Sequence, residues 1–158
     1  MYLYPYKAEW RSEFEKERSL ILANYAGEID IFHIGSTAID GLYAKDCIDI
    51  LGVVKDISLV PSLSRKFIDI GYVSKGAYGI KGREYFSKKV RKVHFHIFQS
   101  GDAAIEKHLT FVKVMRDNLE LIAELNQIKK ELHSKYPNDK DAYQQEKAFF
   151  YSRIGKVL

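Results

Sequence analysis

The feature that most constrains the fold is a nearly continuous apolar run, residues 47–54, which reads Cys-Ile-Asp-Ile-Leu-Gly-Val-Val. A run of this length and composition is typical of a central strand that is covered on at least one face. Its one carboxylate belongs to Asp49. Because an unpaired buried charge costs several kcal/mol or more, Asp49 requires a partner, a metal ion or a cleft. The run therefore predicts a site built on a central strand.

The rest of the first hundred residues predicts a mixed sheet packed by helices. Apolar and aromatic side chains recur at helical spacing near the start of the chain, and shorter apolar segments with bounding glycines follow. We expect helices at residues 6–25 and 59–70, and further strands at 29–34, 83–90 and 92–99. A glycine-spaced stretch, residues 76–82, predicts the loop before the last strand pair.

From residue 102 onward the pattern is wholly helical. Two apolar stripes at helical spacing are separated by Tyr136-Pro-Asn-Asp, in which Asn138 or Asp139 is available as a helix N-cap. A length of 158 residues fits one domain. We therefore expect a single α+β domain over residues 1–158, with a mostly antiparallel mixed sheet in residues 1–100 and a helical tail in 102–158.

Composition bounds the class of protein. The single cysteine, Cys47, excludes an intrachain disulfide, and the first residues lack the pattern of a signal peptide. No apolar stretch reaches the ~18 residues that span a bilayer. These features predict a cytoplasmic protein without a membrane partner. The net charge of +4 suits anionic ligands, but it is spread along the chain and does not indicate nucleic acid.

A glycine–serine turn follows the strand predicted at residues 29–34. Gly35, Ser36 and Thr37 place backbone N–H groups and hydroxyls at a strand end, where phosphate oxygens are commonly held. The alternative is a turn that only caps the following segment. Asp49 likewise has two interpretations, as a site residue or as a structural carboxylate paired with Lys45.

The last predicted strand carries two histidines. Strand alternation places His94 and His96 on one face and the apolar side chains of Val93, Phe95 and Ile97 on the other. If the strands are close, both imidazoles project toward Asp49. Two nitrogens and a carboxylate oxygen form a divalent-metal site with open positions, whereas the alternative is an exposed pair without a ligand.

Arg83 and Glu84 follow the glycine-spaced loop. One interpretation is a solvated charge pair. The alternative is that the two residues contact an anionic ligand, which Arg83 would bind through the bidentate fork of its guanidinium. The basic residues 88–92 are assigned to the tip of a hairpin, because no stacking aromatics accompany them.

Taken together these segments resemble the GrpB family. Its pattern of His-hydrophobic-Gly-Ser-Thr-Ala, Gly-Leu, Lys and hydrophobic-Asp-hydrophobic is matched from His33 to Ile50. An Arg-Glu-Tyr-Phe-x-Lys element is matched at residues 83–88, and a His-x-His strand at His94 and His96. Matches in the tail extend the resemblance over nearly the whole chain.

The resemblance implies a nucleotidyltransferase-like fold. In that superfamily a Gly-Ser turn contacts nucleotide phosphate, and two alternating carboxylates on a strand bind two metal ions for phosphoryl transfer. Here Cys47 stands two positions before Asp49, where the second carboxylate is expected. A two-metal site needs about three carboxylates, so the familiar set is incomplete.

The candidate site residues fall into three groups. Asp49 and Glu84 are the candidate catalytic carboxylates. Asp49, His94 and His96 are the candidate ligands of a divalent metal, which would be Mg, Mn or Zn. The candidate nucleotide- and phosphate-binding residues are Gly35, Ser36, Thr37, Lys45 and Arg83.

Three functions agree with these residues. The first is binding of a nucleotide or phosphorylated small molecule, with metal-assisted nucleotidyl or phosphoryl transfer. The second is a metal-dependent phosphoester hydrolase. The third has no chemistry: the domain serves as a folding or interaction module for a protein partner, with the aromatic-rich tail, residues 136–151, as the contact surface.

Overall fold

The computed structural model describes residues 2–157, with side chains described through residue 153. The strands are β1 (Asp30–Ile34), β2 (Ile48–Val54), β3 (Val73–Ser74), β4 (Arg83–Lys88) and β5 (Val93–Gln99). The α-helices are α1 (Glu9–Asn24), α2 (Val60–Leu63), α3 (Ala103–Arg116), α4 (Leu119–Lys135) and α5 (Lys140–Val157). Short 3₁₀ helices are η1 (Ser36–Ala38), η2 (Ile57–Leu59) and η3 (Arg65–Ile70).

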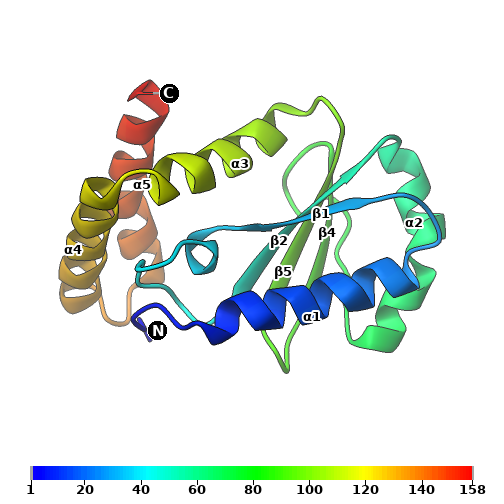
Figure 1. Ribbon diagram of the computed structural model, residues 1–158, viewed down its shortest axis with the longest axis horizontal. Helices are drawn as coiled ribbons and strands as arrows, with labels where there is room; N and C mark the ends of the chain where they lie inside the picture. Colours follow the sequence, from blue (N-terminus) through cyan, green and yellow to red (C-terminus); the bar gives the residue numbers. More distant parts are fainter. Residues whose placement is uncertain (1, 158) are drawn as a thin grey trace.

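The five strands form one mixed sheet in the order β1-β2-β5-β4-β3. β2 and β5 pair in parallel, and the other neighbouring pairs are antiparallel. The apolar run thus forms a strand with neighbours on both sides, as predicted. The predicted α+β class, with a mostly antiparallel sheet and a helical tail, is confirmed (Figure 1).

The two faces of the sheet bury different sets of helices. Ile48, Ile50 and Phe95 face one side and pack in a core with Trp10 of α1 and Phe67 of η3. The opposite face packs on a second core supplied by the C-terminal helices. Figure 1 shows α1 lying across the sheet, with α4 and α5 side by side at one end of the molecule. Among the described residues, none of the helices has the length and apolar character of a membrane span.

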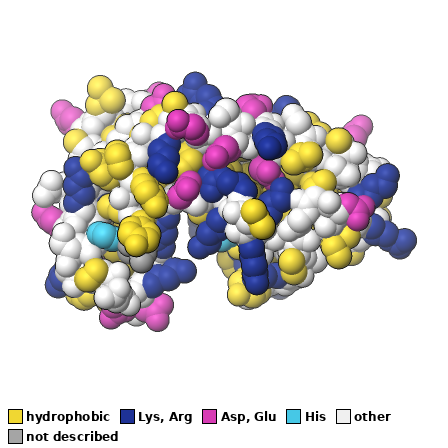
Figure 2. Space-filling model, turned by 90° about the horizontal axis from the view of Figure 1, so that it is seen from below, with side chains coloured by type: hydrophobic (Ala, Val, Ile, Leu, Met, Phe, Trp, Pro, Cys, Tyr) yellow, Lys and Arg dark blue, Asp and Glu magenta, His cyan; other side chains and the backbone are white. Residues whose placement is uncertain are grey.

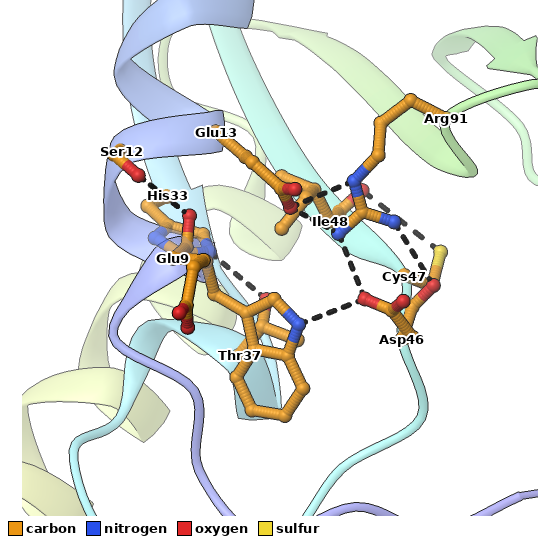
Figure 3. A network of polar contacts seen from close by, with 10 residues as sticks. Glu9, Ser12, Glu13, His33, Thr37, Asp46, Cys47, Ile48 and Arg91 are labelled. Carbon is orange, nitrogen blue, oxygen red and sulfur yellow. Dashed lines mark hydrogen bonds and ion pairs between the residues drawn. The ribbon is translucent and has the colours of Figure 1, made fainter.

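Hydrogen bonds and ion pairs connect α1 to the segment that leads into β2 (Figure 3). The indole Nε1 of Trp10 donates to Asp46 Oδ1 at 2.9 Å. Arg91, in the β4–β5 turn, donates to the same oxygen at 2.9 Å and through Nε to Glu13 Oε2 at 2.8 Å. Burial raises the pKa of Asp46, but the Trp10 and Arg91 contacts outweigh it and leave the pKa lowered. These contacts fix the backbone directly before Cys47.

The structure differs from the sequence expectation at residues 59–70. In place of one helix the chain forms α2 and η3, which meet at Ser64 with φ −103° and ψ 14°. The break lets Phe67 enter the core, where its ring lies 5.2 Å from Phe86 and 5.8 Å from Phe95. Gly71 ends the segment at φ +95°, the left-handed conformation expected of a helix-stop glycine. The two-residue strand β3 was not predicted.

The helical tail contains three helices, not the two expected from its stripes. Asn118 separates α3 from α4 and caps α4, because its side-chain oxygen accepts from Leu121 N at 3.2 Å. Asp139 accepts from Ala142 N at 3.0 Å, which confirms it as the predicted N-cap of α5.

A buried ion pair on the α1 face gives the first prediction. Glu17 is 4% exposed and accepts from both Lys88 Nζ and Tyr72 Oη at 2.8 Å. Glu17→Ala leaves a largely buried ammonium unpaired, so we expect the free energy of unfolding to fall by about 3–5 kcal/mol in urea titrations. Glu15→Ala, on the exposed side of the same helix, is the control and should change it by less than about 0.5 kcal/mol. Equal losses of stability in both variants would contradict a stabilising ion pair between Glu17 and Lys88.

Candidate functional site

The parallel pairing of β2 with β5 brings the predicted carboxylate and imidazoles together. Asp49 is the register partner of His94, and Leu51 that of His96. Asp49 Oδ1 lies 3.5 Å from His94 Nδ1 and 3.9 Å from His96 Nε2. The three side chains are 31%, 35% and 16% exposed, so they open onto a partly covered hollow. Their predicted proximity is confirmed.

Asp49 is ionised in this setting. Burial raises the pKa of its carboxyl, but the His94 and His96 imidazoles beside it outweigh burial and lower the pKa to about 2. The side chain is therefore a full negative charge at neutral pH.

Gly35 packs its backbone directly against this carboxylate. The residue follows β1, whose Ile34 pairs with Asp49, and has φ +72°. A Cβ at Gly35 would lie 2.8 Å from Asp49 Oδ2, a distance that real Cβ atoms essentially never show. Both the backbone angle and the space thus require glycine. The predicted turn lies at the carboxylate.

The two hydroxyls of the turn point to different neighbours. Ser36 Oγ accepts from Lys129 Nζ at 2.7 Å, on the side of the hollow. Thr37 is 2% exposed, and its Oγ1 lies 2.9 Å from His33 Nε2. Ser36 therefore faces the candidate site, whereas the Thr37 hydroxyl is engaged by His33.

Lys129 is a further site residue, and no motif in the sequence marks it. It is 2% exposed and donates to Ser36 Oγ and to the Tyr43 carbonyl, each at 2.7 Å. Burial, with Lys147 and Lys45 nearby, lowers its pKa well below the ordinary value. A signal was present, because Lys129 continues the buried stripe of α4 that includes Ile122, Leu125 and Leu132. A lysine at such a position requires acceptors in the interior.

Lysines surround the hollow beside Asp49. A cavity of about 230 Å³ is lined by Ser36, Cys47, Asp49 and His94 together with the cationic side chains of Lys45, Lys92, Lys129, Lys140 and Lys147. The predicted site residue Lys45 thus lies in this cavity. Figure 2 shows a notch in the molecular surface with Lys and Arg side chains along its walls.

A second hollow adjoins the first. It measures about 900 Å³, lies between α3 and α5, and shares Ser36, Asp49 and Lys147 with the lysine cavity. Burial, followed by repulsion from Lys45, lowers the pKa of Lys147 to about 8. The rings of Phe111 and Tyr151, with centroids 5.2 Å apart, form part of its wall.

Arg83 does not present a free guanidinium to an anion. It is 7% exposed, and its Nε and Nη2 donate to the carbonyls of Ala77 and Tyr78 in the preceding loop. Its Nη1 lies 3.1 Å from His96 Nδ1. Arg83 therefore holds the loop and orients His96, in place of the ligand contact that was expected.

Glu84 is not brought to the site. It pairs with Ile97 in the β4–β5 register, on the opposite face of the sheet from His94 and His96. Alternation along β4 is the reason, since Tyr85 and Ser87 are the neighbours that share the histidine face. The expectation that Glu84 lines the same cleft as Asp49 is wrong.

The donor atoms at the site do not fit a pair of magnesium ions. Among the described residues, the carboxylates that line the two hollows are those of Asp49 and Glu106. The group whose ligand atoms all lie within 4.8 Å of one another is Cys47, Asp49 and His94. Because two-metal transfer needs about three carboxylates around two ions, this chain does not hold that arrangement.

A sequence model described as GrpB protein matches residues 1–156. The chain belongs to the GrpB family. It is 31% identical over 160 residues to glutamate-rich protein GrpB of Alkalihalophilus pseudofirmus, covering 96% of this chain and 92% of that protein. It is 35% identical over 145 residues to UPF0157 protein YqkA of Bacillus subtilis, covering 90% of this chain but 42% of the relative.

Solved structures agree with the family. The crystal structure of conserved protein GrpB from Enterococcus faecalis superposes with a TM-score of 0.91 at 30% identity, over 99% of this GrpB chain and 96% of the other. Cid1 in complex with the UTP analog UMPNPP gives a TM-score of 0.56 at 12% identity, over 82% and 42% of the two chains. At that identity the likeness shows the fold alone, which is nucleotidyltransferase-like.

The close approach at Gly35 gives the second prediction. Gly35→Ala should lower the free energy of unfolding by the backbone penalty, about 1–2 kcal/mol, plus an overpacking cost of about 1–3 kcal/mol against Asp49. Gly76→Ala is a matched control, because Gly76 also has a positive φ but no heavy atom within 4 Å of the place that a Cβ would take. Thermal or urea unfolding of both variants measures the difference. Equal losses would show that no close approach to Asp49 exists.

His33 gives the third prediction, on pH dependence. Burial, followed by the charge of Arg116, lowers the pKa of His33 to about 4. Between pH 6.5 and 4 the unfolded chain then binds a proton that the folded chain does not, so stability contributed by neutral His33 is lost as pH falls through that window. NMR titration of the His33 ring should show a midpoint near pH 4. A midpoint near 6.5 would contradict this environment.

Proposed function

We propose that this GrpB-family chain binds the phosphates of a nucleotide in the lysine cavity beside Asp49. One observation carries the proposal: five lysines and the Ser36 hydroxyl converge on a cavity whose lining includes a single carboxylate, Asp49. Crowded ammonium groups repel one another, and the lowered pKa of Lys147 and Lys45 reflects both burial and that repulsion. A bound polyanion would relieve the repulsion.

The Gly35–Ser36 turn gives the phosphate contact its geometry. Gly35 has no side chain, so its backbone can approach both the carboxylate and a ligand closely. Ser36 offers a hydroxyl to the hollow, and Lys129 Nζ donates to that hydroxyl at 2.7 Å. In this proposal the turn and the lysine together contact a phosphate.

The larger hollow supports a nucleoside as the rest of the ligand. It shares Ser36, Asp49 and Lys147 with the lysine cavity, so a ligand with phosphates in the cavity extends naturally between α3 and α5. The Phe111 and Tyr151 rings there offer flat apolar surfaces for a base. Its volume of about 900 Å³ is within the range of small-molecule sites.

For transfer chemistry, Asp49 is the group that would hold a divalent cation against the phosphates. We propose nucleotidyl or phosphoryl transfer with a single protein-held ion, in which the lysines neutralise charge on the non-reacting phosphates.

Asp49→Asn should then stop transfer while leaving metal-free binding of inorganic triphosphate in place. Loss of both together would contradict this division of roles.

The fourth prediction tests the binding site itself. Inorganic triphosphate and nucleoside triphosphates should raise the melting temperature. At a ligand concentration of 100 Kd the free energy of unfolding should increase by about 2.7 kcal/mol. Lys45→Met should weaken binding about tenfold or more in calorimetric titrations, because it removes a cation from the cavity wall.

The control for that experiment is Lys55→Met. It removes the same charge from a side chain that is 89% exposed and is not part of the cavity lining. Equal Kd values for the two variants would show that affinity reflects net charge and not the cavity. If no phosphate compound changed the melting temperature, the phosphate-binding proposal would be wrong. The remaining function would then be an interaction module for a protein partner.

A further inference from the structure

Cys47 lies at the same site as Asp49 and His94. It directly precedes β2 and is two residues from Asp49, so alternation along the extended chain directs both side chains to one face. His94 is the register partner of Asp49 on the neighbouring strand. The Cys47 sulfur, an Asp49 carboxylate oxygen and a ring nitrogen of His94 all lie within 4.8 Å of one another.

The thiol is not held by a strong partner elsewhere. Its nearest hydrogen-bonding contact is the carbonyl of the next residue, Ile48, at 3.9 Å. Although Cys47 is 8% exposed, it lines the lysine cavity together with Asp49 and His94. The three donors therefore border one hollow, which has room for an ion and for a further ligand.

His96 is excluded from this ligand set by Arg83. A guanidinium has only N–H groups and keeps its charge in proteins, so His96 Nδ1, 3.1 Å from Arg83 Nη1, must be the acceptor. The other ring nitrogen, Nε2, then carries the proton and cannot bind a metal ion. It lies 3.9 Å from Asp49 Oδ1, which is beyond hydrogen-bond distance.

We propose that Cys47, Asp49 and His94 bind one thiophilic divalent ion of the Zn²⁺ or Co²⁺ type. Sulfur, nitrogen and oxygen donors select such ions, whereas Mg²⁺ takes oxygen ligands. On binding, the Cys47 S–H bond breaks, a sulfur–metal bond forms and the proton passes to solvent.

The charges around the proposed ion determine which ligand is favoured at its fourth coordination position. A thiolate and a carboxylate neutralise the two charges of the ion, and His94 completes three protein ligands. A fourth tetrahedral position remains for water or an anion. Lys45 and Lys92 line the same cavity, so an anionic oxygen is the favoured fourth ligand. This last step rests on the proposed phosphate site, but the ion site itself does not.

Cobalt spectroscopy tests the proposal, because Cys47 is the single cysteine of the chain. Titrating the metal-free protein with Co²⁺ should give one equivalent of binding, visible bands of a four-coordinate ion and a thiolate-to-cobalt band in the near ultraviolet. Zn²⁺ should bleach these bands, whereas a large excess of Mg²⁺ should not. A titration without the thiolate band would overturn the proposal.

Three variants assign the ligands. Cys47→Ser should abolish the thiolate band and weaken Zn²⁺ binding about tenfold or more, while circular dichroism confirms that the protein is folded. His94→Gln should lose the band through loss of binding. His96→Gln is the control, and it should keep the band, because His96 is not one of the three proposed ligands.

Other results would contradict the ligand set. An unchanged band in Cys47→Ser, or a loss of the band in His96→Gln equal to that in His94→Gln, would overturn it. Because no nucleotide is present in these titrations, their failure leaves the phosphate-binding proposal standing. Conversely, absence of phosphate binding would not affect the cobalt result.

Discussion

The parallel pairing of β2 with β5 is the constraint on which the rest of the site depends. A parallel neighbour places Asp49 and His94 at one level of the sheet, from segments more than forty positions apart in the chain. The antiparallel partner β1 then delivers Gly35 to the same place, because Ile34 pairs with Asp49. Three strands thus bring a carboxylate, an imidazole and a bare backbone turn together. A shift of either register by one residue would turn these groups to the other face.

Electrostatics around this point is strongly asymmetric. The ionised Asp49 lies beside two imidazoles on the sheet, whereas the cations come mainly from the loop before β2 and from α4 and α5. The protein therefore places its negative group on the rigid sheet and its positive groups on the opposing wall. Such a separation suits a ligand that carries an ion on one side and phosphate oxygens on the other, and it costs stability when no ligand is present.

Much of the sheet could be predicted because apolar patterning is a local property. The run at residues 47–54, the alternation around His94 and the glycine at position 35 each express a constraint within a few residues. Glu84 was misplaced because its face depends on which strand pairs with which, and neighbouring residues do not encode this. Arg83 was misassigned for a related reason, since its partners are loop carbonyls and a histidine across the sheet. The helix expected at residues 59–70 is divided because burying Phe67 outweighs helical continuity.

Lys129 has a consequence for the chain as a whole. Its ammonium joins a helix of the last third of the sequence to the serine of the turn and to the Tyr43 carbonyl in the first third. The hollow beside Asp49 is consequently completed by both halves of the polypeptide, and neither half alone encloses it. Removing the helices after the sheet would therefore take Lys129, Lys140 and Lys147 out of the cavity wall and leave the hollow open on that side.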